Sequence, residues 1–316
     1  MNTQSSLYRE LSESELRAII TSVFPGETLE TYQLLSGGLF NTTYRVVTGQ
    51  HDAVLRMGPV HRELLLPYEQ NLMAAEALTD RLCLENGIPA SVVLHLDTSK
   101  TIIDRDFMVV DRINSIPLSD PSVPEEVKCD LLLECGKLVR HLHTVTSRQF
   151  GRLAKIVTGT GFSNWYDAME SEFRDVFSKA EEFQVFDPAL RDRVYAFLCR
   201  RRDALDAITE PRLTHCDLWA GNILVQKVHD RYSVCAIIDG DRATFGDPAL
   251  DLAPGWITTP EFLEGYGSIA ADPQAAERNQ VYTLFFTLQD AYIWKIEYHR
   301  EDIFQENLRR LEEILK

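Results

Sequence analysis

One stretch decides the fold of this chain: Leu213-Thr-His-Cys-Asp-Leu-Trp-Ala-Gly-Asn-Ile-Leu-Val225, which a polar turn joins to Ala236-Ile-Ile-Asp239. In it Asp217 stands five residues before Asn222, and Asp239 ends an apolar run. Phosphoryl transfer requires a carboxylate near the attacking hydroxyl and oxygen ligands that hold Mg²⁺ on the nucleotide phosphates. A loop that carries Asp217 and Asn222 and faces Asp239 would supply all three groups.

The spacing of Asp217 and Asn222 is that of the protein-kinase catalytic loop. On this pattern Asp217 is the base or orients the acceptor hydroxyl, and Asn222 and Asp239 are the metal ligands. His215, two residues before Asp217, is expected to support the loop. Each residue alone would also fit an ordinary turn, because Asp and Asn are common turn formers. The apolar strands predicted on either side favour the catalytic interpretation.

A family resemblance rests on two segments, His215-Cys-Asp-Leu-Trp-Ala-Gly-Asn222 and Ile237-Ile-Asp239-Gly-Asp-Arg-Ala-Thr-Phe-Gly-Asp-Pro248-Ala-Leu-Asp251-Leu-Ala. Together they resemble the aminoglycoside phosphotransferase family, relatives of the choline and fructosamine kinases with a protein-kinase-like fold. The Gly246-Asp-Pro-x-x-Asp-Leu-Ala253 part is the more discriminating, since choline kinases differ there. The resemblance implies that Asp247 and Asp251 brace the loop and cap a helix.

The order of predicted elements, strands first and then a mostly helical half that holds the catalytic hairpin, indicates an α+β fold with two lobes. The chain has 316 residues, more than a single core usually accommodates. We expect a small β-sheet N-lobe over residues 1–113 that binds the nucleotide. A larger, mostly helical C-lobe over residues 114–316 is expected to hold the catalytic loop and the acceptor.

Composition excludes several classes of function. The net charge of −16 argues against binding to a nucleic-acid backbone. No apolar run reaches the length of a membrane span, and the first residues lack a basic-then-apolar signal, so a cytoplasmic location is expected. The six cysteines form no Cys-x-x-Cys pair and are expected to be free thiols.

The N-terminal part begins with a predicted helix and a hairpin. Ser12-Glu-Ser-Glu15 reads as a capping box, and the helix should end before Pro25-Gly26. Strands over 32–35 and 43–47 flank Ser36-Gly37-Gly38-Leu-Phe-Asn41. A glycine pair lets backbone N–H groups approach phosphate, and it fits a plain hairpin turn equally well. The resemblance favours phosphate contact, because the family has a Gly-Gly-x-x-Asn loop.

A third predicted strand ends at Arg56, where kinase-like folds place the lysine that contacts the phosphates. Arginine keeps the positive charge and offers a fork of donors that suits phosphate. The helix after Pro67 carries Glu69 and Glu76, one of which should pair with Arg56. Glu76 is preferred, and Glu69 could equally be a surface charge.

The last predicted strand of the N-lobe, 107–110, leads into Asp111-Arg-Ile-Asn114. There a kinase-like chain leaves the small lobe, so the resemblance implies that backbone groups from Val110 to Arg112 meet the nucleotide base. After a Pro-rich bend, an apolar stripe over 131–142 predicts a helix. His143 at its end is expected to be structural.

The C-terminal segment carries the candidate acceptor site. A helical pattern is predicted over 280–316, on which Asp290, Trp294, Glu297 and Glu301 follow one another at spacings of four, three and four and so share one face. Carboxylates and an indole would suit a cationic acceptor through charge-assisted hydrogen bonds and cation–π contact. The alternative is that Trp294 lies in the core and the carboxylates only solvate the helix.

These observations predict an ATP-dependent or GTP-dependent kinase that uses Mg²⁺ and phosphorylates a hydroxyl of a small molecule. The acceptor would be an aminoglycoside or another amine-bearing compound, with no nucleic acid or membrane as partner. Asp241 could assist the metal, but a solvent-facing turn residue is the preferred interpretation. Three alternatives remain: a kinase of a non-antibiotic metabolite, a nucleotide-binding pseudokinase module, and a protein kinase, for which the segment after Asp239 is short.

Overall fold

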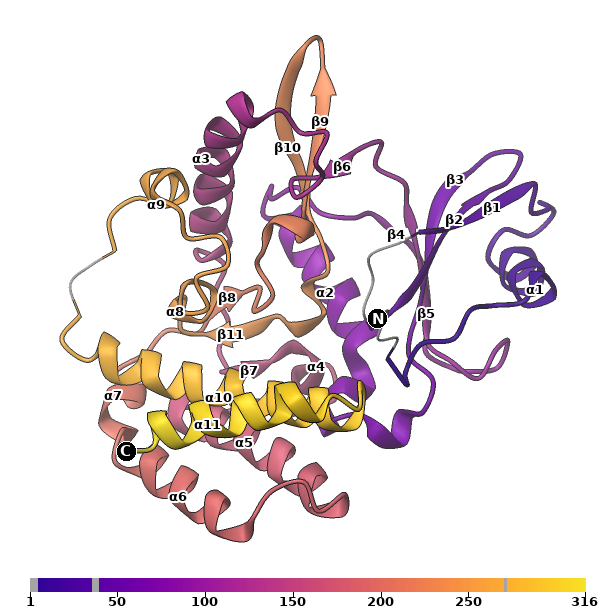
Figure 1. Cartoon of the computed structure of the whole chain (residues 1–316). Helices are drawn as coiled ribbons and strands as arrows, with labels where there is room; N and C mark the ends of the chain where they lie inside the picture. The colour runs from indigo at the N-terminus through magenta and orange to yellow at the C-terminus, as the bar shows by residue number, and fades with distance from the viewer. Residues whose placement is uncertain (1–4, 36–39, 270–271) are drawn as a thin grey trace.

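The structure is a computed structural model that describes residues 5–35, 40–269 and 272–316 (Figure 1). It confirms the α+β class: the five-stranded sheet lies in the N-terminal part of the chain, and helices dominate the remainder, which also holds two smaller sheets. Gly37 and Gly38, predicted as the phosphate loop, lie outside the described residues. All six cysteines are free, as predicted. No helix among the described residues has both the length and the apolar composition of a membrane span.

The N-terminal sheet is antiparallel and has the order β1-β2-β3-β5-β4. Its strands are β1 (Thr31–Leu35), β2 (Thr42–Val47), β3 (Asp52–Met57), β4 (Val93–Asp97) and β5 (Phe107–Asp111). Buried and half-buried residues alternate along β2 and β3, so one face of the sheet packs on helix α1 (Glu13–Val23). The predicted capping box, Ser12 with Glu15, begins α1. The predicted strands over 32–35, 43–47 and 107–110 are confirmed, and β3 continues one residue beyond its predicted end at Arg56.

Helix α2 (Leu72–Glu85) follows two 3-10 helices, η1 (Arg62–Leu64) and η2 (Pro67–Asn71). The prediction of one helix directly after Pro67 is therefore only partly right, because the chain completes a 3-10 segment first. Helix α2 packs on η4 (Gly240–Arg242), where Thr79 Oγ1 donates to the carbonyl of Gly240 at 2.9 Å. A Cβ at Gly240 would lie 2.5 Å from Thr79 Cγ2, so this close approach requires glycine.

The C-terminal part is mostly helical and holds two small three-stranded sheets, of order β10-β9-β6 and β7-β11-β8. The helices are α3 (Glu125–Leu142), α4 (Leu153–Ile156), α5 (Trp165–Glu182), α6 (Pro188–Cys199), α7 (Arg202–Asp206), α8 (Ala249–Leu252), α9 (Pro260–Tyr266), α10 (Ala275–Ile296) and α11 (Glu301–Ile314). The strands are β6 (Ile116–Pro117), β7 (Gly151–Arg152), β8 (Arg212–Thr214), β9 (Ile223–Val228), β10 (Arg231–Ile237) and β11 (Thr244–Gly246).

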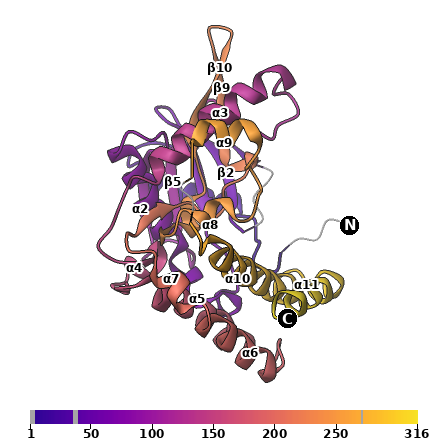
Figure 2. The same cartoon turned by 90° about the vertical axis from the view of Figure 1, so that its left-hand side faces the viewer.

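The predicted helical pattern over 280–316 is interrupted. Helix α10 ends at Ile296 and α11 begins at Glu301, with His299 in the left-handed region at φ 53°. The chain turns back there, so that α10 and α11 lie side by side in both views (Figures 1 and 2). Glu301 consequently leaves the face of α10 and pairs with Lys295 instead.

Helices α3 and α9 also lie side by side (Figure 2). Their backbones approach so closely that a Cβ at Gly136 would lie 2.1 Å from the carbonyl oxygen of Phe262. At Gly265 a Cβ would lie 1.9 Å from the carbonyl oxygen of Leu133. The glycine pair therefore fixes the position of α9, which ends in Tyr266.

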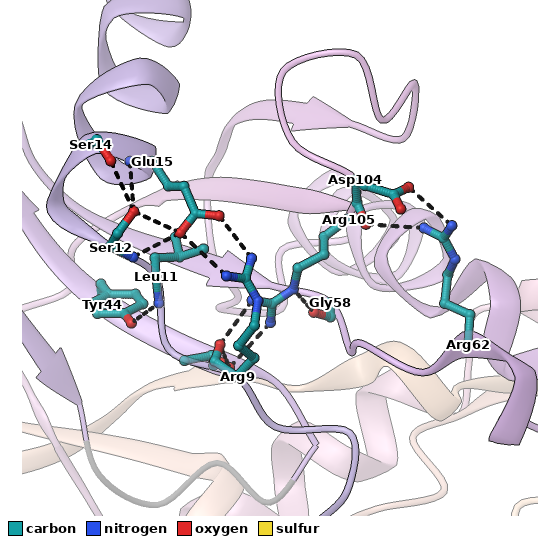
Figure 3. Close-up of polar contacts among 11 residues, drawn as sticks. Arg9, Leu11, Ser12, Ser14, Glu15, Tyr44, Gly58, Arg62, Asp104 and Arg105 are labelled. Atoms are coloured by element: carbon teal, nitrogen blue, oxygen red, sulfur yellow. Dashed lines mark hydrogen bonds and ion pairs between the residues drawn. The ribbon is translucent and has the colours of Figure 1, made fainter.

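The N-terminal segment before α1 is tied to the sheet by Arg105, whose side chain is 2% exposed (Figure 3). Its guanidinium donates to the carbonyls of Gly58 at 2.7 Å and Arg9 at 2.9 Å, and to Thr42 Oγ1 at 3.2 Å. No carboxylate pairs with Arg105 among the described residues, so these neutral acceptors must satisfy a buried cation. Burial lowers the pKa of Arg105 to about 10. Thr42 directly follows Asn41 of the predicted phosphate loop.

We expect Arg105→Met to lower the free energy of unfolding by about 1–3 kcal/mol, because buried acceptors lose charge-assisted hydrogen bonds. Urea denaturation followed by circular dichroism measures the change. Arg62, whose exposed pair with Asp104 lies beside Arg105 (Figure 3), supplies the matched control. Arg62→Met should change stability by less than about 0.5 kcal/mol. Equal losses in both variants would contradict the structural role assigned to Arg105.

Candidate active site

Strands β9 and β10 bring Asn222 and Asp239 together. Ile223 pairs with Ile237, so the residues just outside this pair meet at the end of the hairpin. The N–H of Ile238 donates to the carbonyl of Asn222 at 2.9 Å. Asp239 comes next and adopts a left-handed backbone at φ 65°. The hairpin register therefore places the two predicted metal ligands at neighbouring positions.

Asn222 also fixes Asp217. Its Nδ2 donates to Asp217 Oδ2 at 3.0 Å and to the carbonyl of Asp217 at 2.9 Å. The amide carbonyl oxygen of Asn222 is left for another partner, which suits a metal ligand. Burial, and next the charge of Asp239, raise the pKa of Asp217. A raised pKa makes this carboxylate a better proton acceptor than an ordinary surface aspartate.

The backbone of the loop around Asp217 is held by the buried side chain of Asp251, which is 3% exposed. Asp251 accepts the backbone N–H groups of His215 at 2.8 Å and Cys216 at 2.6 Å. Cys216 has φ 63°, a left-handed conformation that a non-glycine residue keeps only when its surroundings enforce it. This geometry confirms that Asp251 braces the loop. Burial opposes its charge, but the hydrogen bond with His143 keeps the pKa of Asp251 below its usual value.

His143 extends this support to α9. Its ring lies between Asp251, at 3.0 Å from Nε2, and the hydroxyl of Tyr266, at 2.7 Å from Nδ1. His215 works on the other side of the loop: its Nε2 donates to the carbonyl of Ile238 at 2.9 Å, and its Nδ1 accepts the N–H of Asp217. Both histidines are structural, as predicted.

Arg56 at the end of β3 contacts two carboxylates. One guanidinium nitrogen lies 3.1 Å from Glu76 Oε2 and also donates to Asp239. The predicted pairing with Glu76 is present. Glu69 pairs with Arg242 at 3.1 Å and its side chain is fully buried, so its interpretation as a surface charge is wrong. The reason is that η2 turns Glu69 inward beneath η4.

Acidic groups outnumber cations around Arg56. The carboxylates of Glu76, Asp239 and Asp241 have oxygens within 4.8 Å of one another. Burial and the charge of Asp239 raise the pKa of Asp241 to about 8, whereas Arg56 overcomes burial and lowers the pKa of Asp239. Asp241 is buried, so the prediction of a solvent-facing turn residue is wrong. Carboxylate and amide oxygens are the ligands that Mg²⁺ prefers, and this set fits the ion.

A cavity of about 660 Å³ lies above these residues. The predicted site residues that line it are Asn41, Arg56, Asp217, Asn222, Asp239, Asp290, Trp294 and Glu297. Glu76 lies behind Arg56 and does not line the cavity. Val110 packs with Met73 and Met108, and Arg112 pairs with Asp52 at 3.2 Å, so neither side chain lines the described cavity.

Helix α10 forms the wall opposite the catalytic loop. Its cavity-facing residues follow helical spacing: Phe286, Gln289, Asp290, Ile293 and Trp294, with Glu297 just past its end. The prediction that Glu301 shares this face is wrong, because the helix ends before it. Trp294 lines the cavity, which excludes the alternative that it lies wholly in the core.

Sequence reasoning assigned no role to several cavity residues, among them Phe40, Trp219, Arg242 and Phe286. Trp219 lies against Gly221, where a Cβ would come within 2.2 Å of the indole. The position of Trp219 inside the motif was a usable signal, since an exposed indole beside Asp217 contacts whatever binds there. Trp256 and Tyr298 belong to the C-terminal segments that were expected to form the acceptor pocket, and both line the cavity.

We expect Asp251→Ala to lower the free energy of unfolding by about 3–5 kcal/mol, because it leaves buried donors on His215, Cys216 and His143 unpaired. The wild-type contribution should be present above the unfolded pKa of aspartate and be lost as the pH falls through the lower folded pKa. Denaturation at several pH values measures both effects. The exposed Glu277 supplies the control Glu277→Ala, and a loss no larger than that of the control would refute the bracing role.

Comparisons with known proteins agree with this geometry. A sequence model described as "Phosphotransferase enzyme family" matches residues 31–281. No curated protein sequence matches the chain. A proposed fructosamine-3-kinase from Haemophilus somnus 129PT superposes with a TM-score of 0.68 at 15% identity, covering 95% of this chain and 97% of that one.

Two aminoglycoside phosphotransferases are also similar in structure. APH(4)-Ia, in a ternary complex with ADP and hygromycin B, has a TM-score of 0.66 at 17% identity and covers 95% of this chain and 98% of its own. APH(2")-IIIa, in complex with GDP and kanamycin, has a TM-score of 0.63 at 18% identity, with 96% and 98% covered. These likenesses confirm the kinase-like fold. Since the family match spans most of the sequence, the chain belongs to the phosphotransferase enzyme family and is a small-molecule kinase.

Proposed function

We propose that this kinase transfers the γ-phosphoryl group of ATP, in the presence of Mg²⁺, to a hydroxyl of a small amine-bearing molecule bound in the cavity. The observation that carries the proposal is the convergence of Asp217, Asn222, Asp239 and Arg56 on one cavity whose far wall bears Asp290 and Glu297. The printed ligands of the similar structures, nucleotides with hygromycin B or kanamycin, agree with a nucleotide and an amino sugar as substrates.

Each residue has a defined part in the proposed reaction. The acceptor oxygen attacks the γ-phosphorus, the bond from phosphorus to the ADP oxygen breaks, and the acceptor proton passes to Asp217. Asn222 keeps the Asp217 carboxylate oriented through its Nδ2. Asp239 and the carbonyl oxygen of Asn222 would hold Mg²⁺, which neutralises charge on the phosphates. Arg56, positioned by Glu76, would contact the phosphates as they enter.

We also propose the two-lobe division at residues 113 and 114, with the nucleotide between the lobes and its base near the backbone of Val110 and Arg112. The separate apolar cluster of α1 and the N-terminal sheet supports a distinct small lobe. Helix α2 is shared, because its residues Leu72 and Ala75 pack into the large C-terminal core. Asn41 at the cavity supports a phosphate role for the loop that precedes β2.

A nucleotide-binding module without turnover is the competing function. One measurement distinguishes the kinase from such a module. Thermal stabilisation by Mg-ATP without phosphorylation of any acceptor would favour the module. Comparison of ATP with GTP in the same assay assigns the donor. An aminoglycoside as the best acceptor would indicate antibiotic resistance, whereas a cellular amine would indicate a metabolic role in the cytoplasm.

We expect Asp217→Ala to lower kcat by about 10²–10⁴-fold, because the proton acceptor is lost. Nucleotide affinity should remain close to that of the wild type, since Asp217 acts on the acceptor. Steady-state kinetics and calorimetric titration with Mg-ATP measure the two quantities. A near-wild-type kcat would remove Asp217 from its proposed role.

Asp239→Asn should abolish Mg²⁺-dependent nucleotide binding, because a charged metal ligand becomes neutral. Asn222→Ala should affect metal binding less, since water can replace a carbonyl oxygen, and should lower kcat because Asp217 loses its hydrogen bond. Titration of ATP with and without Mg²⁺ separates the two variants. If neither changed the Mg²⁺ requirement, the proposed metal site would be wrong.

A further inference from the structure

The acceptor half of the cavity is lined by aromatic side chains. Trp256 and Phe286 form one pair, with ring centroids 6.1 Å apart, and Trp294 and Tyr298 form another at 4.7 Å. Trp219 of the catalytic loop is 43% exposed and Trp256 is 51% exposed. Indole surface left open inside a cavity is available for stacking on an apolar or aromatic face of a ligand. The wall therefore offers several aromatic faces for contact with an acceptor.

The arginines that line the described cavity are already paired. Arg152 lies 2.6 Å from Glu172, and Arg242 lies 3.1 Å from Glu69. Arg56 contacts Glu76 and Asp239, as described above. None of the three is left to attract an anionic acceptor. The charge that selects the acceptor must come from the remaining carboxylates on the α10 side.

Two carboxylates remain on this side of the cavity, Asp290 and Glu297, and they differ in their exposure. Asp290 is exposed to the cavity and has no hydrogen bond or ion pair within the described part of the chain. Glu297 is 2% exposed, and its Oε1 has no hydrogen-bond partner there. Burial, and next the neighbouring Glu69, raise the pKa of Glu297 well above its usual value, whereas desolvation by the surrounding cavity walls raises that of Asp290 to about 6. Asp290 is therefore the accessible, unpaired carboxylate of this wall, and Glu297 offers a buried oxygen without a partner.

We propose that the acceptor is a hydroxylated monocation with an apolar or aromatic face, bound with its ammonium at Asp290 and a hydroxyl group at Glu297. This inference rests on the proposed kinase function and refines its substrate class. The two side chains are seven residues apart on and just past α10, about 10 Å along the axis, which sets the span of the acceptor. On this wall Asp290 is the exposed carboxylate and Glu297 is 2% exposed, so the further ammonium groups of a polycationic amino sugar would lack exposed carboxylates to pair them here.

The test compares kcat/KM across three sets of alcohols: aryl or alkyl monoamines such as phenylalaninol, their deaminated analogues such as phenylpropanol, and polycationic kanamycin. We expect the monoamines to give the highest values. Asp290→Asn should raise the KM of the best monoamine at least about tenfold, the usual effect of losing a charge-assisted hydrogen bond. The KM of Mg-ATP should stay the same.

Two further comparisons assign the roles along α10. Glu297→Leu should raise the acceptor KM more than Glu297→Gln, because glutamine keeps a polar group that can hydrogen-bond the acceptor hydroxyl. Glu301→Gln is the matched control, since this carboxylate lies outside the cavity and pairs with Lys295, and it should leave acceptor KM within about twofold. Preference for kanamycin, or equal turnover of the deaminated analogues, would overturn this acceptor class and leave the kinase standing. No transfer to any alcohol would overturn the kinase proposal as well.

Discussion

The active site depends on one buried carboxylate, Asp251. By accepting the adjacent N–H groups of His215 and Cys216, it holds the chain in the left-handed turn that presents Asp217 to the cavity. Without such an acceptor, two buried donors would lack partners and the strained turn would relax. Asp251 is itself fixed through His143 and Tyr266 to the closely packed helices α3 and α9. A helix pair some distance from the chemistry thereby positions the proposed base.

The second constraint is the concentration of negative charge around Arg56. Arg56 contacts Glu76 and Asp239, and Asp241 lies close to both carboxylates, which leaves an excess of acidic oxygens at the point where phosphates and a metal would enter. Such a group of buried carboxylates is costly for the empty protein and is relieved by a divalent cation. A single nitrogen of the Arg56 guanidinium makes both contacts, so its positive charge, and not its fork of donors, holds the two carboxylates.

The sequence alone was sufficient to predict the site residues whose positions depend on local spacing. Asp217, Asn222 and Asp239 lie on one loop and one short hairpin, so their convergence follows from the register of β9 and β10. The capping box of α1 and the strands of the N-terminal sheet could be predicted for the same reason, because short local patterns specify them. Contacts between segments that are distant in the sequence could not be predicted. The residues around Glu69 do not indicate that it pairs with Arg242, and those around Trp256 do not indicate that it faces Phe286. The end of α10 was missed because no glycine or proline marks it, and His299 makes the turn instead.

The central claim is that the loop held by Asp251 transfers a phosphoryl group from nucleotide to an acceptor alcohol. Phosphorus-31 NMR of the protein with ATP, Mg²⁺ and the best alcohol of an acceptor screen tests it most directly. The account predicts a new phosphate monoester resonance that grows in step with ADP. Release of inorganic phosphate alone, or no consumption of ATP with any alcohol, would contradict it.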